Sequence, residues 1–244
     1  MRALLIMLVA VTALVLPTGP VQAADHKIDP DRDIIVGKLG AAGPKNELIV
    51  YLSPGCRSCL KTFGATARKI LEGYVAPGHL RVVVRLVPQL HNRLQDPDKE
   101  ASALQASVNW GVETQCVKDL SGGLDAVVSF VWLAVIYHEM GQADGNPAKT
   151  WPLLDQEGFK KYREISQKYK RLKDFDWSYC YSPSSKKEYV NQFLENAEIL
   201  KSVRSDGRSS VPSYFLNGEL IPFSPVPSAS MVLEALAEAI PEAE

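Results

Sequence analysis

Apolar residues form short strand-like runs near both ends of the chain and helical repeats between them. Residues 47–52 are an almost continuous apolar run, which is typical of a strand buried on both faces. Between residues 60 and 74 the apolar positions recur at spacings of three and four, which marks one face of a helix. Residues 80–87 are rich in β-branched side chains and predict a second strand. This order predicts a parallel βαβ unit.

Residues 98–203 are predicted to be helical throughout. Within them, residues 124–137 are apolar on nearly all sides but too few to span a membrane, so they indicate a helix buried in the protein. Residues 141–152 have the composition of a loop, and a polar helical stretch rich in Lys and Tyr follows to about residue 176. Apolar positions between residues 190 and 200 then predict an amphipathic helix.

Strand character returns in the last 40 residues of the chain. Two short apolar runs, residues 211–216 and 219–221, are separated by Asn-Gly, the strongest local signal of a β-hairpin. A closing helix is predicted over residues 228–240. The element order is therefore β-α-β, a long helical insertion, and β-β-α, which belongs to the α/β class.

The first residues of the chain predict a secretory signal peptide. An apolar stretch follows Arg2, helix-breaking residues end it, and the small-residue site Val21-Gln22-Ala23 predicts cleavage before Ala24. The apolar stretch is shorter than the roughly 18 residues that a spanning helix needs. Residues 1–23 are therefore interpreted as a signal peptide, and residues 24–45 as a polar, turn-rich N-terminal extension. The mature protein is expected in the periplasm.

Charge and composition exclude several classes of function. Without residues 1–23 the chain carries 26 basic and 28 acidic residues, a formal charge of −2, which does not suggest a nucleic-acid partner. The four histidines, residues 26, 79, 91 and 138, show no metal-ligand spacing, and no cofactor-binding motif is visible. We therefore expect no metal and no cofactor.

The residues that carry chemistry are Cys56-Arg57-Ser58-Cys59, which follow the first predicted strand and begin the first predicted helix. Two cysteines on one helical turn can form a reversible disulfide. The helix N-terminus favours an anion at Cys56, so its thiol should ionise more readily than a free thiol, and Arg57 adds a positive charge. Cys59 should be more buried and resolve a mixed disulfide. Two alternatives are a structural disulfide and half of a zinc site.

The chain resembles the thioredoxin superfamily and, within it, the DsbA family of periplasmic disulfide-forming enzymes. The resemblance is carried by the segment 53–59 after a buried strand, by the helical insertion, and by Val211-Pro212 followed by residues 213–218. It implies a thioredoxin fold with a long helical insertion. The thioredoxin-fold domain would then comprise residues 46–97 and 204–244, with residues 98–203 as the insertion.

The resemblance also assigns roles to individual residues. Pro212 fits the place of the cis-proline that faces the redox pair in this family, and Val211 that of the residue whose backbone binds the substrate peptide. Arg57 and Ser58 differ from the central residues of well-known oxidases and of thioredoxin, and these positions influence the reduction potential. Several family members have a buried glutamate six positions before the first cysteine, but this chain has Val50.

The other two cysteines, Cys116 and Cys180, lie in the helical insertion. In an oxidising compartment they are predicted to form a structural disulfide that closes a loop of about 65 residues. Two buried free thiols or a second redox role are the alternatives.

The resulting expectation is an exported thiol-disulfide oxidoreductase that introduces disulfides into secreted proteins. Its substrates would be unfolded or reduced secreted proteins, a membrane partner like DsbB would reoxidise it, and we expect it to be a monomer. The alternatives are an isomerase or reductase with the same fold, a metallochaperone that binds copper or zinc through the two cysteines, and a chaperone without redox turnover.

Overall fold

The computed structural model describes residues 26–38, 43–88, 97–131, 177–180, 182–222 and 228–241. The strands are β1 (Ile34–Val36), β2 (Asn46–Leu52), β3 (Leu80–Leu86), β4 (Ser213–Leu216) and β5 (Glu219–Leu220). The helices are α1 (Arg57–Ile70), with a π-helical turn η1 (Leu71–Val75) at its end, α2 (Pro97–Ser121), α6 (Trp177–Cys180), α7 (Pro183–Val203) and α8 (Ala229–Ala239). Residues 123–131 are also helical.

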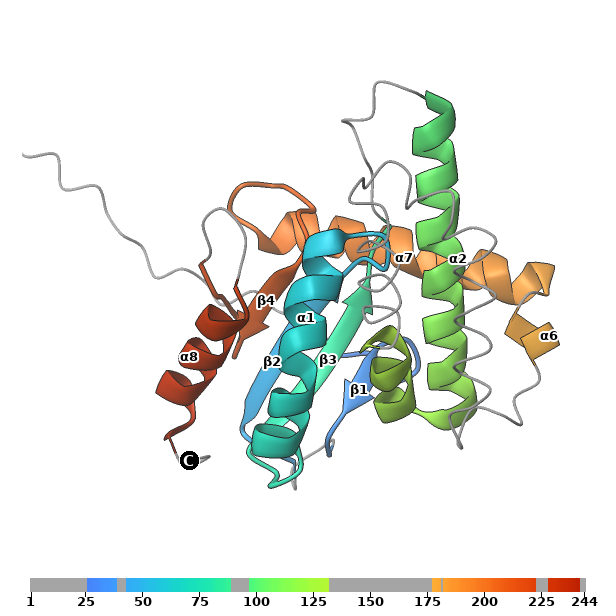
Figure 1. Cartoon of the computed structure of the whole chain (residues 1–244). Helices are drawn as coiled ribbons and strands as arrows, with labels where there is room; N and C mark the ends of the chain where they lie inside the picture. The colour runs from blue at the N-terminus through green and yellow to red at the C-terminus, as the bar shows by residue number, and fades with distance from the viewer. Residues whose placement is uncertain are drawn as a thin grey trace, which may run out of the picture.

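The five strands form one sheet in the order β1-β3-β2-β4-β5 (Figure 1). β2 lies in the centre and pairs with β3 in parallel over all seven of its residues. The other pairs, β1 with β3, β2 with β4, and β4 with β5, are antiparallel. The predicted βαβ unit and the α/β fold class are therefore confirmed.

The predicted hairpin is formed by β4 and β5. Asn217 and Gly218 connect the strands with φ values of 53° and 84°, both in the left-handed region. A two-residue hairpin turn of the type I′ requires positive φ at both central positions, which explains why Asn-Gly occupies them.

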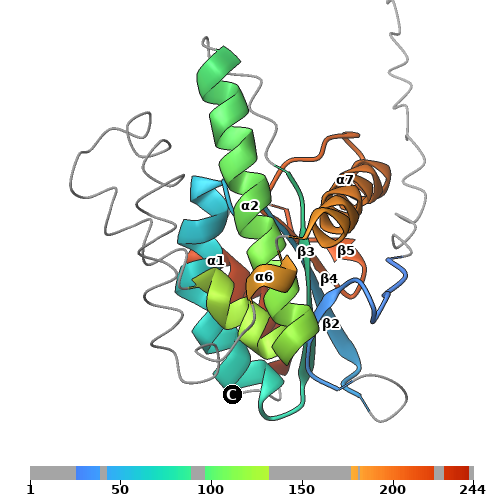
Figure 2. The ribbon, with the colours of Figure 1, turned by 90° about the vertical axis from the view of Figure 1, so that its right-hand side faces the viewer.

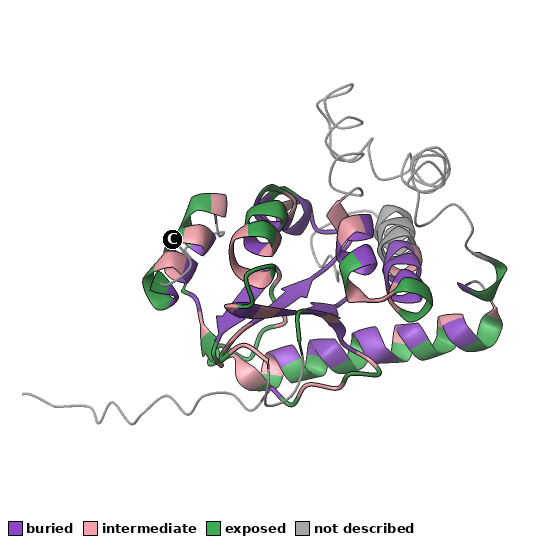
Figure 3. Ribbon diagram, turned by 90° about the horizontal axis from the view of Figure 1, so that it is seen from below, coloured by how far each residue is buried: buried purple, intermediate pink, exposed green. Residues whose placement is uncertain are grey.

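Helices cover both faces of the sheet. Figure 2 shows α1 on one side and α7 on the other. Side chains alternate along β2. Leu48, Val50 and Leu52 pack in the core cluster that contains α1 and α8, whereas Ile49 and Tyr51 pack in a smaller cluster with the last turns of α7, at Ala197 and Leu200. The continuous apolar run of β2 follows from burial on both faces, and Figure 3 shows the burial of the sheet between the helices.

The described part of the helical insertion packs on the sheet through α7, which contacts β3, and its helices pack on one another. α2 contacts both α6 and α7, and a disulfide joins Cys116 on α2 to Cys180 on α6, the pairing that the sequence predicts. The helix over residues 123–131 begins at Gly123, where a Cβ would collide with the backbone of Ile35. Within the residues that the structure describes, no helix is both long and apolar enough to cross a membrane.

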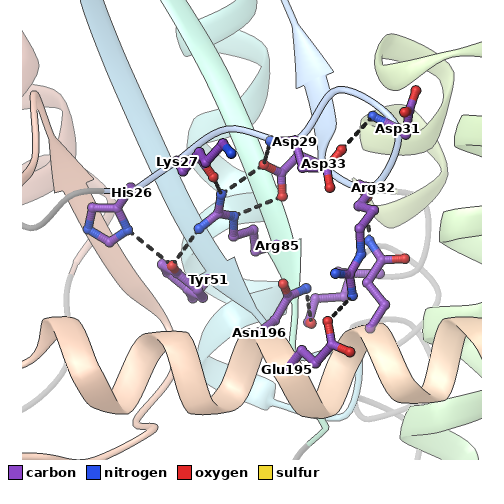
Figure 4. Close-up of polar contacts among 12 residues, drawn as sticks. His26, Lys27, Asp29, Asp31, Arg32, Asp33, Tyr51, Arg85, Glu195 and Asn196 are labelled. Atoms are coloured by element: carbon purple, nitrogen blue, oxygen red, sulfur yellow. Dashed lines mark hydrogen bonds and ion pairs between the residues drawn. The ribbon is translucent and has the colours of Figure 1, made fainter.

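The sequence analysis did not predict β1, which adds an edge strand to the sheet from the N-terminal extension. A buried polar network fixes this extension on the α7 face (Figure 4). Arg85 on β3 donates to both carboxylate oxygens of Asp33 at 2.8 Å, to the hydroxyl of Tyr51 at 3.0 Å and to the carbonyl of Lys27 at 2.7 Å. A ring nitrogen of His26 lies 3.1 Å from the Tyr51 hydroxyl. These contacts attach the extension to β2 and β3.

α7 is also held by polar contacts to the sheet and to the extension. The side-chain amide of Asn196 donates to the Leu86 carbonyl at 2.9 Å, and Gln192 donates to the carbonyl of Arg32. Because Leu86 is the last residue of β3, these bonds hold α7 across the carboxyl end of that strand.

Several sequence predictions fall outside the described residues. These are the signal peptide 1–23, the segment 132–176 that contains the rest of the predicted buried helix, the loop and the polar helical stretch, and the histidines at positions 91 and 138.

We expect Asp33→Ala to lower the free energy of unfolding by about 3–5 kcal/mol, because it leaves the buried charge of Arg85 without its partner. The matched control is Glu72→Ala, since the Arg68–Glu72 pair is exposed and is expected to contribute about 0.5 kcal/mol or less. Urea unfolding of both variants measures the difference. Equal losses would show that the buried pair does not stabilise the fold.

Replacing both Cys116 and Cys180 by alanine should lower the free energy of unfolding by about 2–4 kcal/mol, because the bridge restricts the unfolded chain over a separation of 64 residues. Urea unfolding measures this loss. Both proteins carry Cys56→Ser and Cys59→Ser, so that a Cys56–Cys59 disulfide does not affect the free energy of unfolding. An unchanged unfolding midpoint would contradict a structural role for this disulfide.

Candidate active site

The candidate site lies where the central strand turns into the first helix. β2 ends at Leu52, and the turn 53–55 brings the chain to Cys56, which is the N-cap of α1. The backbone N–H of Cys56 donates to the Ser53 carbonyl at 3.0 Å, and the Cys56 carbonyl accepts from Leu60 N–H at 3.0 Å. Both bonds fix the position of Cys56, as the sequence predicts.

The sulfur of Cys56 acts as the capping group of the helix. Its Sγ accepts from the backbone N–H of Cys59 at 3.3 Å. The pKa of Cys56 lies below its ordinary value because the Cys59 thiol and the backbone N–H groups of Cys59 and Ser58 donate to its sulfur, although burial works in the opposite direction. An unpaired N–H group at a helix N-terminus favours an anion at this place. Cys56 is therefore the cysteine of the pair that ionises first.

Cys59 has the opposite environment, one turn into the helix. Its side chain is fully buried, and Ser53 N–H lies 3.5 Å from its sulfur. Burial raises the pKa of the Cys59 thiol well above its ordinary value, and its hydrogen bond to Cys56 and the charge of Cys56 raise it further. Cys59 is thus a thiol when Cys56 is a thiolate, and both are free cysteines in the structure.

Val211 and Pro212 lie directly across from the cysteines. The Val211–Pro212 peptide bond is cis, and the Val211 carbonyl is 3.6 Å from the sulfur of Cys56. The loop before them is held by Ser213, whose hydroxyl donates to the Ser210 carbonyl at 2.6 Å and accepts from Arg204 at 2.9 Å. The structure therefore brings Val211 and Pro212 to the redox pair, as the resemblance implies, while their role in substrate binding stays a prediction.

The other predicted site residues are placed as follows. Ser58 contributes its backbone N–H to Cys56, whereas the side chain of Arg57 lies outside the described part of the structure. Cys116 and Cys180 form a disulfide with each other and are not part of the candidate site. No group of three or more His, Cys, Asp or Glu side chains that could hold a metal ion occurs among the described residues.

Sequence reasoning missed one polar residue of the site, Tyr214. It lies on β4 directly opposite Val50 of β2, two residues beyond Pro212, and it is fully buried in the core cluster that contains both cysteines. Burial and the negative charges of Cys59 and Cys56 raise its pKa well above 10. The sequence does contain a signal for this residue. Tyr214 is two residues after Pro212 in a mostly apolar strand, and residues two apart in a strand lie on the same face of the sheet.

Comparison with known proteins identifies the fold. The chain is similar to a protein-disulfide isomerase from Novosphingobium aromaticivorans, with 15% identity, a TM-score of 0.54 and coverage of 86% of this chain and 98% of that one. It is also similar to oxidised BdbD from Bacillus subtilis (11%, TM-score 0.51, 87% and 95% covered) and to a variant of alpha-DsbA1 from Wolbachia pipientis (16%, 0.52, 86% and 92%). Neither a scan of protein-family models nor a search of curated protein sequences gave a match.

These similarities extend over nearly the whole of the compared chains. The protein therefore has a thioredoxin fold with a helical insertion. More particularly, it has the arrangement of the DsbA-like structures, and the expected fold is confirmed.

We expect iodoacetamide to modify Cys56 of the reduced, folded protein and to leave Cys59 unmodified. Only the thiolate reacts, and the pKa of Cys56 is lowered. The rate of Cys56 modification should therefore stay high below about pH 8.5, the midpoint of a free thiol, and fall only at lower pH. Mass spectrometry of the labelled peptide at a series of pH values measures both effects. In unfolded protein both cysteines should react with a midpoint of about 8.5. Preferential labelling of Cys59 would refute the assignment.

Proposed function

We propose that this protein is a thiol-disulfide oxidoreductase that acts through Cys56 and Cys59. The observation that carries the proposal is the difference between the two thiols. Cys56 has a lowered pKa at the N-terminus of α1 and faces the Val211 carbonyl, whereas Cys59 is fully buried with a raised pKa. A pair built for structure alone needs no such difference, whereas exchange needs one sulfur that reacts with the partner and one that resolves the intermediate.

In the oxidising direction, the thiolate of a substrate protein attacks Sγ of Cys56 in the oxidised pair. The Cys56–Cys59 bond breaks, Cys59 leaves as a thiolate that takes up a proton, and a mixed disulfide joins Cys56 to the substrate. A second substrate thiolate then attacks the substrate sulfur of this mixed disulfide, which forms the substrate disulfide and releases Cys56 as a thiolate. Two electrons pass from the substrate thiols to the pair, which ends reduced.

The position of Val211 supports a binding role for the backbone before Pro212. Its carbonyl is beside Cys56, and a backbone carbonyl at this place can accept a hydrogen bond from the backbone N–H of an extended substrate segment. In this mode of binding the hydrogen bond is made to the backbone of the substrate and not to its side chains, so substrates of many sequences can bind.

The direction that we propose is oxidation of secreted proteins. Interactions that lower the pKa of Cys56 stabilise the reduced pair, and a stabilised reduced pair makes its disulfide a stronger oxidant. This stabilisation is present above the ordinary pKa of a thiol and is lost as the pH falls through the lowered pKa of Cys56. The DsbA-like fold supports the same direction, although one of the similar structures is described as a protein-disulfide isomerase.

The proposed compartment is the periplasm, reached by means of the signal peptide 1–23. The Cys116–Cys180 disulfide supports an oxidising environment, since such bridges are rare where thiols are kept reduced. Reduced secreted proteins would be the substrates of a monomeric enzyme, and a quinone-linked membrane protein of the DsbB kind would return the pair to the disulfide state.

Oxidative refolding of reduced ribonuclease A tests the proposal. The oxidised protein should accelerate the recovery of ribonuclease activity, and Cys56→Ser should abolish the acceleration because it removes the sulfur that forms the mixed disulfide. The matched control is Cys116→Ser/Cys180→Ser, which changes the same residue type away from the site and should keep the rate within about threefold, provided that it is assayed below its unfolding temperature.

Three further results distinguish the proposed oxidase from its alternatives. Equilibrium with glutathione buffers should give a reduction potential near about −120 mV, whereas about −270 mV indicates a thioredoxin-like reductant. Faster recovery of scrambled than of reduced ribonuclease would indicate an isomerase. Unchanged refolding with Cys56→Ser would refute an enzymatic role and leave a chaperone or a metal-binding protein.

A further inference from the structure

The Cys56–Cys59 bond cannot form or break without placing negative charge on the sulfur of Cys59. Cys59 attacks as a thiolate when the bond forms and leaves as a thiolate when it breaks. The side chain of Cys59 is fully buried, so water does not solvate this charge. A buried anion is costly unless hydrogen-bond donors compensate for the lost solvation. The backbone N–H of Ser53 is one such donor, 3.5 Å from the sulfur, and a second donor on the α1 face of the sheet would stabilise the thiolate further.

The β2–β4 strand pair carries the hydroxyl of Tyr214, two residues beyond Pro212. Val50 on β2 is opposite Tyr214 on β4, and opposite residues of an antiparallel pair point to the same side of the sheet. Val50, Tyr214 and Cys59 belong to the same core cluster. Val50 has no polar side-chain atom, whereas Tyr214 is fully buried and has a phenol hydroxyl.

The electrostatics of Tyr214 agree with this placement. Burial raises its pKa most, the charge of Cys59 raises it next, and the charge of Cys56 has a smaller effect. The hydroxyl is thus more strongly coupled to Cys59 than to Cys56. Because its pKa is well above 10, the phenol keeps its proton and can act as a donor. Among the described residues, Cys56 affects the pKa of Cys59, and the charge of Cys59 affects the pKa of Tyr214.

We propose that the hydroxyl of Tyr214 stabilises the thiolate of Cys59 while the Cys56–Cys59 bond forms or breaks. The inference rests on the proposed exchange function and names a residue that acts in one of its steps. In the closing direction, the Cys59 thiol gives its proton to solvent, and the thiolate attacks Sγ of Cys56 in the mixed disulfide. The Cys56–Cys59 bond then forms, and the bond to the partner breaks with release of the partner thiolate. Tyr214 retains its proton throughout.

The test follows the reaction of reduced protein with oxidised glutathione by acid quench and mass spectrometry. The first phase, formation of the Cys56–glutathione adduct, depends on the glutathione concentration, whereas the closure phase that releases glutathione does not. In Tyr214→Phe the pH midpoint of closure should rise by about one unit, and closure below that midpoint should slow about tenfold, since a hydrogen bond to a charged group is lost. The first phase should change less than about twofold.

The matched control is Tyr51→Phe. It makes the same chemical change on β2, but Tyr51 faces the α7 side of the sheet and binds Arg85 instead. Its closure midpoint should equal that of the wild type. If Tyr214→Phe does not fold, 3,5-difluorotyrosine incorporated at position 214 provides the second variant, because its more acidic hydroxyl is a stronger donor and should lower the closure midpoint.

The outcomes separate this inference from the proposed function. A wild-type protein that forms no glutathione adduct contradicts the function itself. A wild-type protein that forms the adduct and closes normally, together with a Tyr214→Phe variant whose closure midpoint is unchanged, overturns the role of Tyr214 alone. Slowing of both phases without a shift of the midpoint would indicate a packing effect and would also overturn it.

Discussion

The pairing of β2 with strands on both sides is the constraint on which the rest of the structure depends. β2 is hydrogen-bonded to β3 along its whole length and to β4 over residues 48–51. A strand paired on both sides and covered on both faces cannot shift its register without moving apolar side chains into the wrong layer. The position at which β2 ends is thereby fixed, and so is the start of α1. The two cysteines owe their placement to this strand and to the hydrogen bonds that join them to Ser53, the residue directly after it.

The same geometry makes the two thiols different. At the end of the strand, the helix offers N–H groups that require an acceptor, and the sulfur of Cys56 takes that role. One turn further, the helix turns its side chains onto the sheet, which leaves the sulfur of Cys59 without access to water. Both cysteines are buried, with exposed fractions of 5% for Cys56 and 0% for Cys59. The lowered pKa of Cys56 and the raised pKa of Cys59 thus follow from their order on a helix that begins at a buried strand.

The sequence was sufficient for the elements whose residues carry a strong local pattern. The continuous apolar run of β2, the helical repeat of α1 and the Asn217-Gly218 turn each determine their own structure. β1 was not predicted because its three residues become a strand only through pairing with β3 and through the contact of Asp33 with Arg85, which is 52 residues away. Tyr214 was missed for a similar reason, since its importance depends on the residue opposite it on another strand.

The central claim is that Cys56 is the sulfur that becomes bonded to a substrate protein, and trapping of that bond tests it most directly. In a Cys59→Ser variant the resolving thiol is absent, so a complex with a reduced secreted protein should accumulate. Peptide mapping of the isolated complex should place the intermolecular disulfide at Cys56. A complex linked through Cys116 or Cys180, or no covalent complex with the folded variant, would contradict the account.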